Sequence, residues 1–239
     1  MQSGEMNYLP LAPAFFLILV GIFIIAVVVI ELRLLRYAYM RTGISSRAAL
    51  FLLFASLIGS YINIPVHEFP GSLVQTSEEI SRFGVHYIVP AVVRREGTIL
   101  AVNVGGAIIP VLLSIYLLFK NEFWVQGAIA TAIIAAIMHW LATPVPGVGI
   151  AVPMFIPPVV TAIVAVLMAR HHAAALAYVS GSLGTLIGAD LMNLGAVQKL
   201  GAPVASIGGA GTFDGIFLTG ILAVLLAGLF HGRAQTSPI

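Results

Sequence analysis

Residues Leu11–Ile30 read LAPAFFLILVGIFIIAVVVI, a stretch of 20 residues without one charged side chain. An α-helix of about 20 apolar residues is long enough to cross the hydrocarbon core of a bilayer. The residues before this stretch include Glu5 but neither Lys nor Arg, whereas a secretory signal has a basic start and a shorter apolar region. We therefore expect a retained helix that spans a membrane.

The composition of the whole chain favours the same environment. Of its 239 residues, 60% are hydrophobic and 8% are charged, against about 45–50% and about 25% in soluble domains. These values exclude a soluble globular domain, which could not bury so much apolar surface, and a disordered chain. The net charge is +2 with scattered basic residues, and there is no cysteine. We therefore expect no nucleic-acid partner, no disulfide and no thiolate metal site.

Apolar runs long enough to cross a bilayer recur along the rest of the chain. Backbone within a bilayer must satisfy its own hydrogen bonds, and these runs are too long for barrel strands, so they predict helices. The predicted fold class is all-α, a polytopic transmembrane bundle of about seven helices in a single membrane domain over residues 1–239. The predicted spans are 10–32, 48–66, 101–119, 124–143, 154–169, 173–194 and 213–230.

The distribution of basic residues predicts the orientation of these helices. Loops on the cytoplasmic side of a membrane carry an excess of Lys and Arg. With the N-terminus outside, seven basic residues fall inside and four fall outside. We therefore expect an N-out, C-in protein of the prokaryotic cytoplasmic membrane. The inner residues are Arg33, Arg36, Arg41, Arg47, Lys120, Arg170 and Arg233, and the outer ones are Arg82, Arg94, Arg95 and Lys199.

The only long connection between predicted helices is the outer segment 67–100. Ser77-Glu78-Glu79 before an apolar residue predicts a short helix start. Val, Ile and Tyr are dense on both sides of Arg95-Glu96-Gly97, which predicts a small extracytoplasmic β-hairpin over 85–104. Pro90 makes the first strand an edge strand. Such an edge could bind an extended peptide by β-augmentation, or the hairpin could simply cover the outer surface.

The chain contains two aspartates, Asp190 and Asp214, in or at the edge of the predicted helices 173–194 and 213–230. A membrane aspartate costs about 2.5–3.5 kcal/mol at a helix centre, so it is expected where it is used. These helices are antiparallel neighbours joined by an outer loop, which places both carboxyl groups at similar depth. Two facing carboxyl groups share one proton, so one can activate a water while the other acts as an acid. This chemistry needs no metal and no cofactor.

The sequence around both aspartates resembles a known family. GTFDGIFLTGILAVLLAG, residues 211–228, looks like the start of the seventh helix in presenilins and signal peptide peptidases, where Gly-x-Gly-Asp precedes an apolar helix. IGADLMNL, residues 187–194, resembles their other catalytic helix. The resemblance implies a distant prokaryotic branch of these intramembrane aspartyl proteases. In that case Asp190 and Asp214 are the catalytic pair, Gly211 is the first glycine of the motif, and the substrate is a transmembrane peptide or protein.

The chain departs from that pattern at three places. Phe213 stands where the family has its second glycine, and Ala189 stands where it has tyrosine. The Pro-Ala-Leu segment of the family has no counterpart after Asp214. Two other readings of the aspartates therefore stay open: a proton- or cation-coupled membrane carrier, and a non-catalytic scaffold that binds a partner helix. Asp214 could also cap its own helix.

Several residues near the aspartates are candidates for supporting roles. Gly188 belongs to a row of small residues that suits close helix packing, and Asn193 lies within one turn of Asp190, in reach of a hydrogen bond. Pro157 and Pro158 end the proline-rich segment 144–158. That segment either lines the site as unwound backbone or forms an outer loop and a helix start. The predicted partners are the transmembrane substrate and the lipid bilayer, and the oligomeric state stays open.

Overall fold

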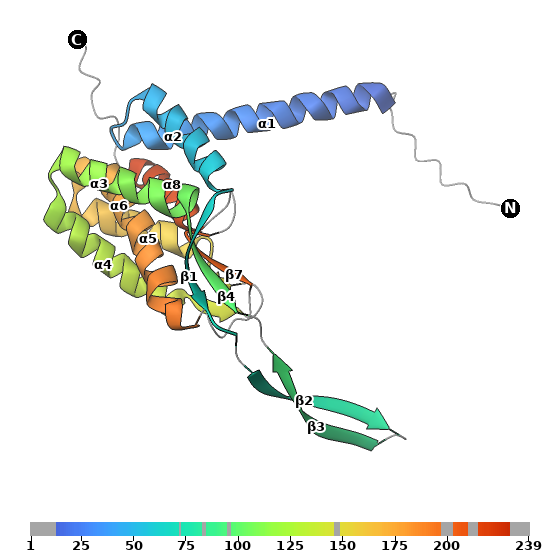
Figure 1. Ribbon diagram of the computed structural model, residues 1–239. Coiled ribbons are helices and arrows are strands. Elements are labelled where there is room, and N and C mark those ends of the chain that lie inside the picture. The colour runs from blue at the N-terminus through green and yellow to red at the C-terminus, as the bar shows by residue number, and fades with distance from the viewer. Residues whose placement is uncertain are drawn as a thin grey trace, which may run out of the picture.

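Helices make up most of the computed structural model, which describes residues 13–71, 73–82, 85–94, 97–145, 149–196, 203–209 and 215–229 (Figure 1). Each of the seven predicted spans overlaps one α-helix of the described chain. These helices are α1 (Pro13–Arg41), α2 (Ser46–Gly59), α3 (Ile109–Asn121), α4 (Trp124–Leu141), α5 (Ile156–Met168), α6 (Ala173–Thr185) and α8 (Gly215–Leu229). Helix α1 continues nine residues beyond its predicted span.

Short helical turns lengthen two of these helices. The π-helix η1 (Val104–Ile108) precedes α3, while the 3₁₀ turn η2 (Arg170–His172) precedes α6. The π-helix η3 (Leu186–Asp190) and the 3₁₀ turn η4 (Leu191–Asn193) follow α6. With these turns included, Val104–Asn121 and Arg170–Ala196 join α4, Trp124–Leu141, as the three described helical segments long and apolar enough to cross a membrane. The finding supports a helical membrane protein.

The predicted span 48–66 is too long. Helix α2 ends at Gly59, and residues Asn63–Phe69 form strand β1. Pro65 explains the difference, because proline disfavours helical backbone at the residue before it and cannot donate a helical hydrogen bond. The predicted span 101–119 likewise begins too early, since strand β4 (Thr98–Asn103) occupies its first residues.

Loops and helix ends rich in basic residues gather at one end of the bundle, which we call the basic end. The Arg41 guanidinium at the end of α1 donates to the carbonyl of Gly228 in α8, at 2.9 Å. The Lys120 ammonium at the end of α3 donates to the carbonyl of Gly43, in the α1–α2 loop. These contacts join three chain segments, as expected for helices that alternate in direction.

The strands gather at the opposite end, which we call the sheet end (Figure 1). Strands β1, β4 and β7 (Val204–Ile207) form a three-stranded sheet in the order β1-β4-β7. β1 pairs with β4 antiparallel, whereas β4 pairs with β7 parallel. A second, short hairpin joins β5 (Thr143–Val145) to β6 (Gly149–Ala151), between α4 and α5.

The predicted hairpin over 85–104 is wrong in its pairing. Strand β3 (Val85–Arg94) pairs with β2 (Leu73–Arg82), while β4 pairs with β1 and β7. The predicted helix start at Ser77-Glu78-Glu79 is also wrong, because these residues lie within β2. A helix start there rested on a local capping pattern, and the ten-residue register with β3 overrides it.

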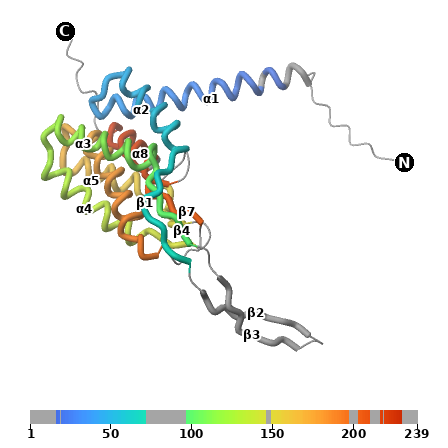
Figure 2. Tube along the Cα trace, viewed as in Figure 1, coloured from blue at the N-terminus to red at the C-terminus, as the bar shows by residue number. Residues whose placement is uncertain are grey.

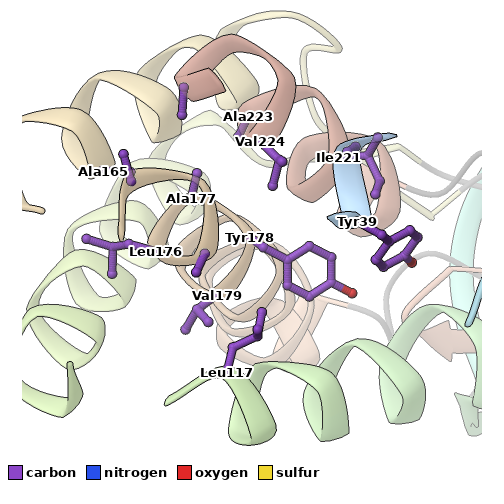
Figure 3. Close-up of a cluster of buried hydrophobic side chains, with 14 of the residues drawn as sticks. Tyr39, Leu117, Ala165, Leu176, Ala177, Tyr178, Val179, Ile221, Ala223 and Val224 are labelled. Atoms are coloured by element: carbon purple, nitrogen blue, oxygen red, sulfur yellow. The ribbon is translucent and has the colours of Figure 1, made fainter. Parts of the chain in front are cut away.

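Helix α6 is central to the bundle, since it contacts α3, α4, α5 and α8, whose traces lie together in Figure 2. Nearly all its residues are buried, as expected for a helix that is apolar on every side. Figure 3 shows Leu176, Tyr178 and Val179 of α6 within the cluster of buried side chains. Tyr39, near the end of α1, meets Tyr178 with ring centroids 5.8 Å apart.

Candidate functional site

Asp190 is the last residue of η3 and lies half-buried at the sheet end. Its Oδ2 atom accepts a hydrogen bond from the backbone N–H of Gly208, at 2.8 Å. Gly208 directly follows β7 and is 18 residues further along the chain. A hydrogen bond to a carboxylate is among the stronger kinds in proteins. The contact therefore ties the end of the central helix to the end of the sheet.

Gly208 fits this position for two reasons. Its φ of +88° is a backbone conformation that glycine adopts without the strain other residues meet. A Cβ atom at Gly208 would lie 2.6 Å from the backbone nitrogen of Ala107 and 2.7 Å from the Ala107 Cβ. The backbone of Gly208 is therefore pressed against η1 on one side while its N–H bonds Asp190.

Two π-helices meet the same small cluster at the sheet end. Ala107 of η1, Leu186 of η3 and Ile216 of α8 are buried together, and partly buried Val102 and Ile207 pack against them. π-helical turns are rare and occur frequently at functional sites. Leu186 is four residues before Asp190, and Ile216 is two residues after Asp214. The first turn of α8 thus packs against the helix that carries Asp190.

Asp214 and Gly211 lie outside the described residues. The described chain reaches Gly209 on one side of them and begins again with α8 on the other. Both of these flanks lie at the sheet end: Gly208 contacts Asp190, and Ile216 belongs to the same buried cluster as Leu186.

A buried hydrogen-bond network supports the backbone around Gly208. Asn103, at the end of β4, donates from its Nδ2 to the Ser60 carbonyl at 2.7 Å and to Asn63 Oδ1 at 3.1 Å. Its Oδ1 accepts the N–H of Gly106 at 2.8 Å and so caps η1. One side chain therefore joins the end of α2, the start of β1 and the start of η1.

Ser206 of β7 extends the network toward Gly208. Its hydroxyl lies 2.6 Å from Asn63 Oδ1 and 2.9 Å from the carbonyl of Gly209. A serine hydroxyl has one proton, so it donates to one of these two oxygens at a time. The segment that bonds Asp190 is thereby held twice, by β4 through the sheet and by β1 through Asn63.

Asn193 acts on the helix end rather than on the carboxyl group. Its Nδ2 donates to the carbonyls of Gly188 at 3.0 Å and Ala189 at 2.9 Å. These carbonyls belong to the last turn of η3. The amide thus bonds the backbone of the turn that ends in Asp190, instead of making the predicted bond to its carboxylate.

Gly188 lies against α4. A Cβ atom at this position would overlap the carbonyl oxygen of Ala135 and lie 2.7 Å from the Cβ of Met138. The glycine row on α6 is therefore a packing face, and Gly181 of the same row meets Gly220 of α8 in the same way. Gly188 supports the site by allowing η3 to approach α4 closely.

Pro157 and Pro158 lie buried in the first turn of α5. Proline suits a helix start, where its missing N–H has no helical partner. The described part of the proline-rich segment consists of the β5–β6 hairpin and this helix start. The arrangement is that of a loop followed by a helix start, one of the two interpretations of the sequence.

The residues that sequence reasoning missed are those that hold Asp190 in place. Gly208, Asn63 and Ser206 come from separate segments, and no local pattern joins them. The adjacent glycines Gly208-Gly209 were the one local signal, since they indicate a turn with positive φ, which both residues adopt. Within the described residues, no group of three or more His, Asp or Glu side chains could hold a metal ion.

Residues 57–226, more than two thirds of the chain, match a family model described as "Protein of unknown function (DUF1614)". The chain therefore belongs to this family. The matched region begins in the last turn of α2 and ends within α8, so it includes the sheet and both aspartates. No match was found among the curated proteins or among the solved structures.

Proposed function

We propose that this member of the DUF1614 family is an intramembrane aspartyl protease whose catalytic residues are Asp190 and Asp214. The observation that carries the proposal is the position of Asp190. Its carboxylate is fixed by Gly208 at the end of the central helix, where the first turn of α8 packs against the same helix. We further propose the N-out, C-in topology with seven spans, in a prokaryotic cytoplasmic membrane, so that the site lies near the outer surface.

The contacts between α6 and α8 support a pairing of the two aspartates. Gly181 faces Gly220 where the helices cross. Asp190 is nine residues after Gly181, and Asp214 is six residues before Gly220. At about 1.5 Å per residue, Asp190 is about 13 Å beyond Gly181, and the start of α8 at Gly215 is about 8 Å beyond Gly220, both toward the sheet end. Leu186 and Ile216 also belong to one cluster of buried side chains closer to the site.

The proposed chemistry is hydrolysis by a carboxyl pair that shares one proton. Because Oδ2 of Asp190 accepts the Gly208 N–H, we assign its Oδ1 to the shared proton. The ionised member removes a proton from a water, whose oxygen bonds to the carbonyl carbon of the substrate. The C–N bond then breaks, and the protonated member gives its proton to the leaving amine. Both members act together, so the loss of either one stops the reaction.

The sheet offers a way to present the substrate as an extended chain. Among the described strands, β7 has β4 on one side, and its end leads directly to Gly208. A peptide that adds to the other side of β7 by β-augmentation would expose its carbonyls beside Asp190. The sequence offered the first strand of the hairpin 85–104 as one candidate for this role, whereas the residue that bonds Asp190 follows β7.

Cleavage of a model transmembrane substrate by the reconstituted protein tests the proposal. Asp190→Asn and Asp214→Asn should each abolish cleavage, because each removes one member of the pair while preserving shape. Glu122→Gln is the matched control: it makes the same change of a carboxyl to an amide on an exposed residue after α3. Normal cleavage by both aspartate variants would overturn the proposal.

One observation favours the carrier as a second candidate. The hydroxyl-bearing side chains of Tyr39, Tyr178 and Ser182 are buried in the middle of the bundle, where a Cβ on Gly220 would lie 2.6 Å from Ser182 Oγ. Buried polar groups between the two ends of a bundle are what an ion path requires. A proton or cation flux into vesicles that is lost in Asp190→Asn, without any cleavage by the unmodified protein, would identify the carrier. If the protein showed neither cleavage nor flux, the non-catalytic scaffold would be the remaining candidate.

A further inference from the structure

A groove of about 810 Å³ lies between α2 and α3, and Asp190 is not among the residues that line it. Its walls are apolar side chains, among them Phe51, Leu52 and Ala55 of α2 and Ile109, Leu112 and Tyr116 of α3. Phe51 is 71% exposed and Leu112 is 61% exposed, so the walls are open to whatever surrounds the protein. In a membrane protein such a surface faces lipid chains.

One end of the groove is polar and cationic. Lys120 and Ser45 line it there, at the basic end. The Lys120 ammonium donates to the Gly43 carbonyl and lies 5.6 Å from the centre of the Tyr116 ring. An ammonium has three N–H donors, and the contact with Gly43 uses one of them. Ser45 is the N-cap of α2, so the positive end of that helix points to the same place.

The length of the groove matches one leaflet of a bilayer. Ser45 to Ala55 on α2 and Ile109 to Lys120 on α3 both border it. At about 1.5 Å per residue, these segments are each about 15–17 Å long. Half of the roughly 30 Å hydrocarbon core is about 15 Å. The apolar part of the groove thus reaches from the interface at the basic end to about the middle of the bilayer.

We propose that this groove binds one anionic phospholipid of the leaflet at the basic end. One acyl chain lies between α2 and α3, and the phosphate lies at Lys120 and the N-terminus of α2. Basic pockets between transmembrane helices recognise anionic headgroups in this way. The charge of Lys120 selects an anionic over a zwitterionic lipid, and the apolar walls provide contacts common to both. The proposal does not depend on protease activity.

Native mass spectrometry of the detergent-solubilised protein tests the proposal. Phosphatidylglycerol and phosphatidylcholine with identical acyl chains are added separately at equal concentrations. The unmodified protein should retain phosphatidylglycerol about fivefold more tightly, the expected contribution of one basic residue at a membrane surface. Lys120→Ala should abolish this preference, and Lys120→Arg should restore most of it. Leu112→Trp should weaken the binding of both lipids, because it fills the groove.

Arg170→Ala is the matched control, since it removes one exposed charge at the basic end without touching the groove. It should leave the lipid preference unchanged. Equal retention of the two lipids by the unmodified protein would overturn the proposal, as would an unchanged preference in Lys120→Ala. A lipid-free dimer that Leu112→Trp converts to a monomer would show instead that a second copy occupies the groove.

Discussion

The two ends of the bundle use polar groups in different ways. At the basic end, long cationic side chains donate to loop or helix-end acceptors: Arg41 to Gly228, Lys120 to Gly43 and Arg36 to the Ser46 hydroxyl. At the sheet end, short side chains and backbone N–H groups join residues such as Asp190 with Gly208, and Asn63 with Ser206. Long side chains can follow small movements of their acceptors, whereas short ones fix a geometry. The sheet end is therefore the better place for a reaction that needs two groups held at a fixed distance.

We therefore expect substitutions at the sheet end to lower the free energy of unfolding more than substitutions at the basic end. The largest effect is expected for Gly208→Ala. Its Cβ would press on Ala107, and the positive φ would be strained, so the free energy of unfolding should fall by about 3 kcal/mol. Reversible unfolding in detergent, followed by circular dichroism, measures this change.

Gly195→Ala is the control for that prediction, because a Cβ at Gly195 meets nothing within 4 Å. Its free energy of unfolding should stay within about 0.5 kcal/mol of that of the unmodified protein. If the two alanine variants were equally stable, the close packing of Gly208 against η1 would be refuted.

A smaller loss is expected for Asn103→Ala. The change removes the cap of η1 and leaves the Ser60 carbonyl and the Gly106 N–H without this partner in a buried region. The expected cost is about 2 kcal/mol, and the same unfolding measurement detects it. Asn121→Ala near the basic end, which removes one bond to the Leu117 carbonyl, should cost about half as much or less. A larger loss of stability in Asn121→Ala than in Asn103→Ala would contradict the expected difference in rigidity between the two ends.

Arg41→Ala is expected to cost about 1 kcal/mol, because the bond from Arg41 to Gly228 is only partly buried and is screened by solvent. The loss of stability in Arg41→Ala should be smaller when the thermal midpoint is measured in higher salt, since salt screens the interactions of exposed charges. A loss as large as that of Gly208→Ala would show that the basic end is as rigid as the sheet end.

The smallest expected effect is a gain in stability rather than a loss. Glu122, after α3, has a φ of +53°, a conformation that costs a residue with a Cβ about 1–2 kcal/mol. Glycine removes this strain but adds disorder to the unfolded chain, so Glu122→Gly should stabilise the protein by about 0.5 kcal/mol. A higher thermal midpoint would confirm the expectation, while a lower one would show that the Glu122 side chain has a stabilising role.

The sequence predicted the helices well because each depends on its own apolar run. It failed where partners lie far apart in the chain. The turn signal at residues 95–97 does separate two strands, but β4 pairs with β7, about 100 residues further on. Pro65 could have shown the early end of α2, since it disfavours helical backbone before it. The run of apolar residues around it concealed that signal.

The candidate site was likewise predictable only where a residue stands out in its own stretch of sequence. Asp190 was identifiable from its residue type alone, because an aspartate in an apolar helix is costly. Its bond to Gly208 depends on the positive φ of that glycine and on the path of β7, and neither follows from local sequence. The role of Asn193 was mistaken because spacing within one turn fits both the Asp190 carboxylate and the helix-end carbonyls.

The pairing of Asp190 with Asp214 is tested most directly by a disulfide. The protein has no cysteine, so Asp190→Cys with Asp214→Cys introduces the only two thiols. A disulfide requires Cα atoms about 4.4–6.8 Å apart. The positive control is Ser182→Cys with Gly220→Cys, because a Cβ at Gly220 would lie 2.6 Å from Ser182 Oγ, and the negative control is Glu122→Cys with Asp214→Cys. Our account predicts that mild oxidation links the first pair as readily as the positive control. Efficient linking of the positive control, with none between positions 190 and 214, would contradict it.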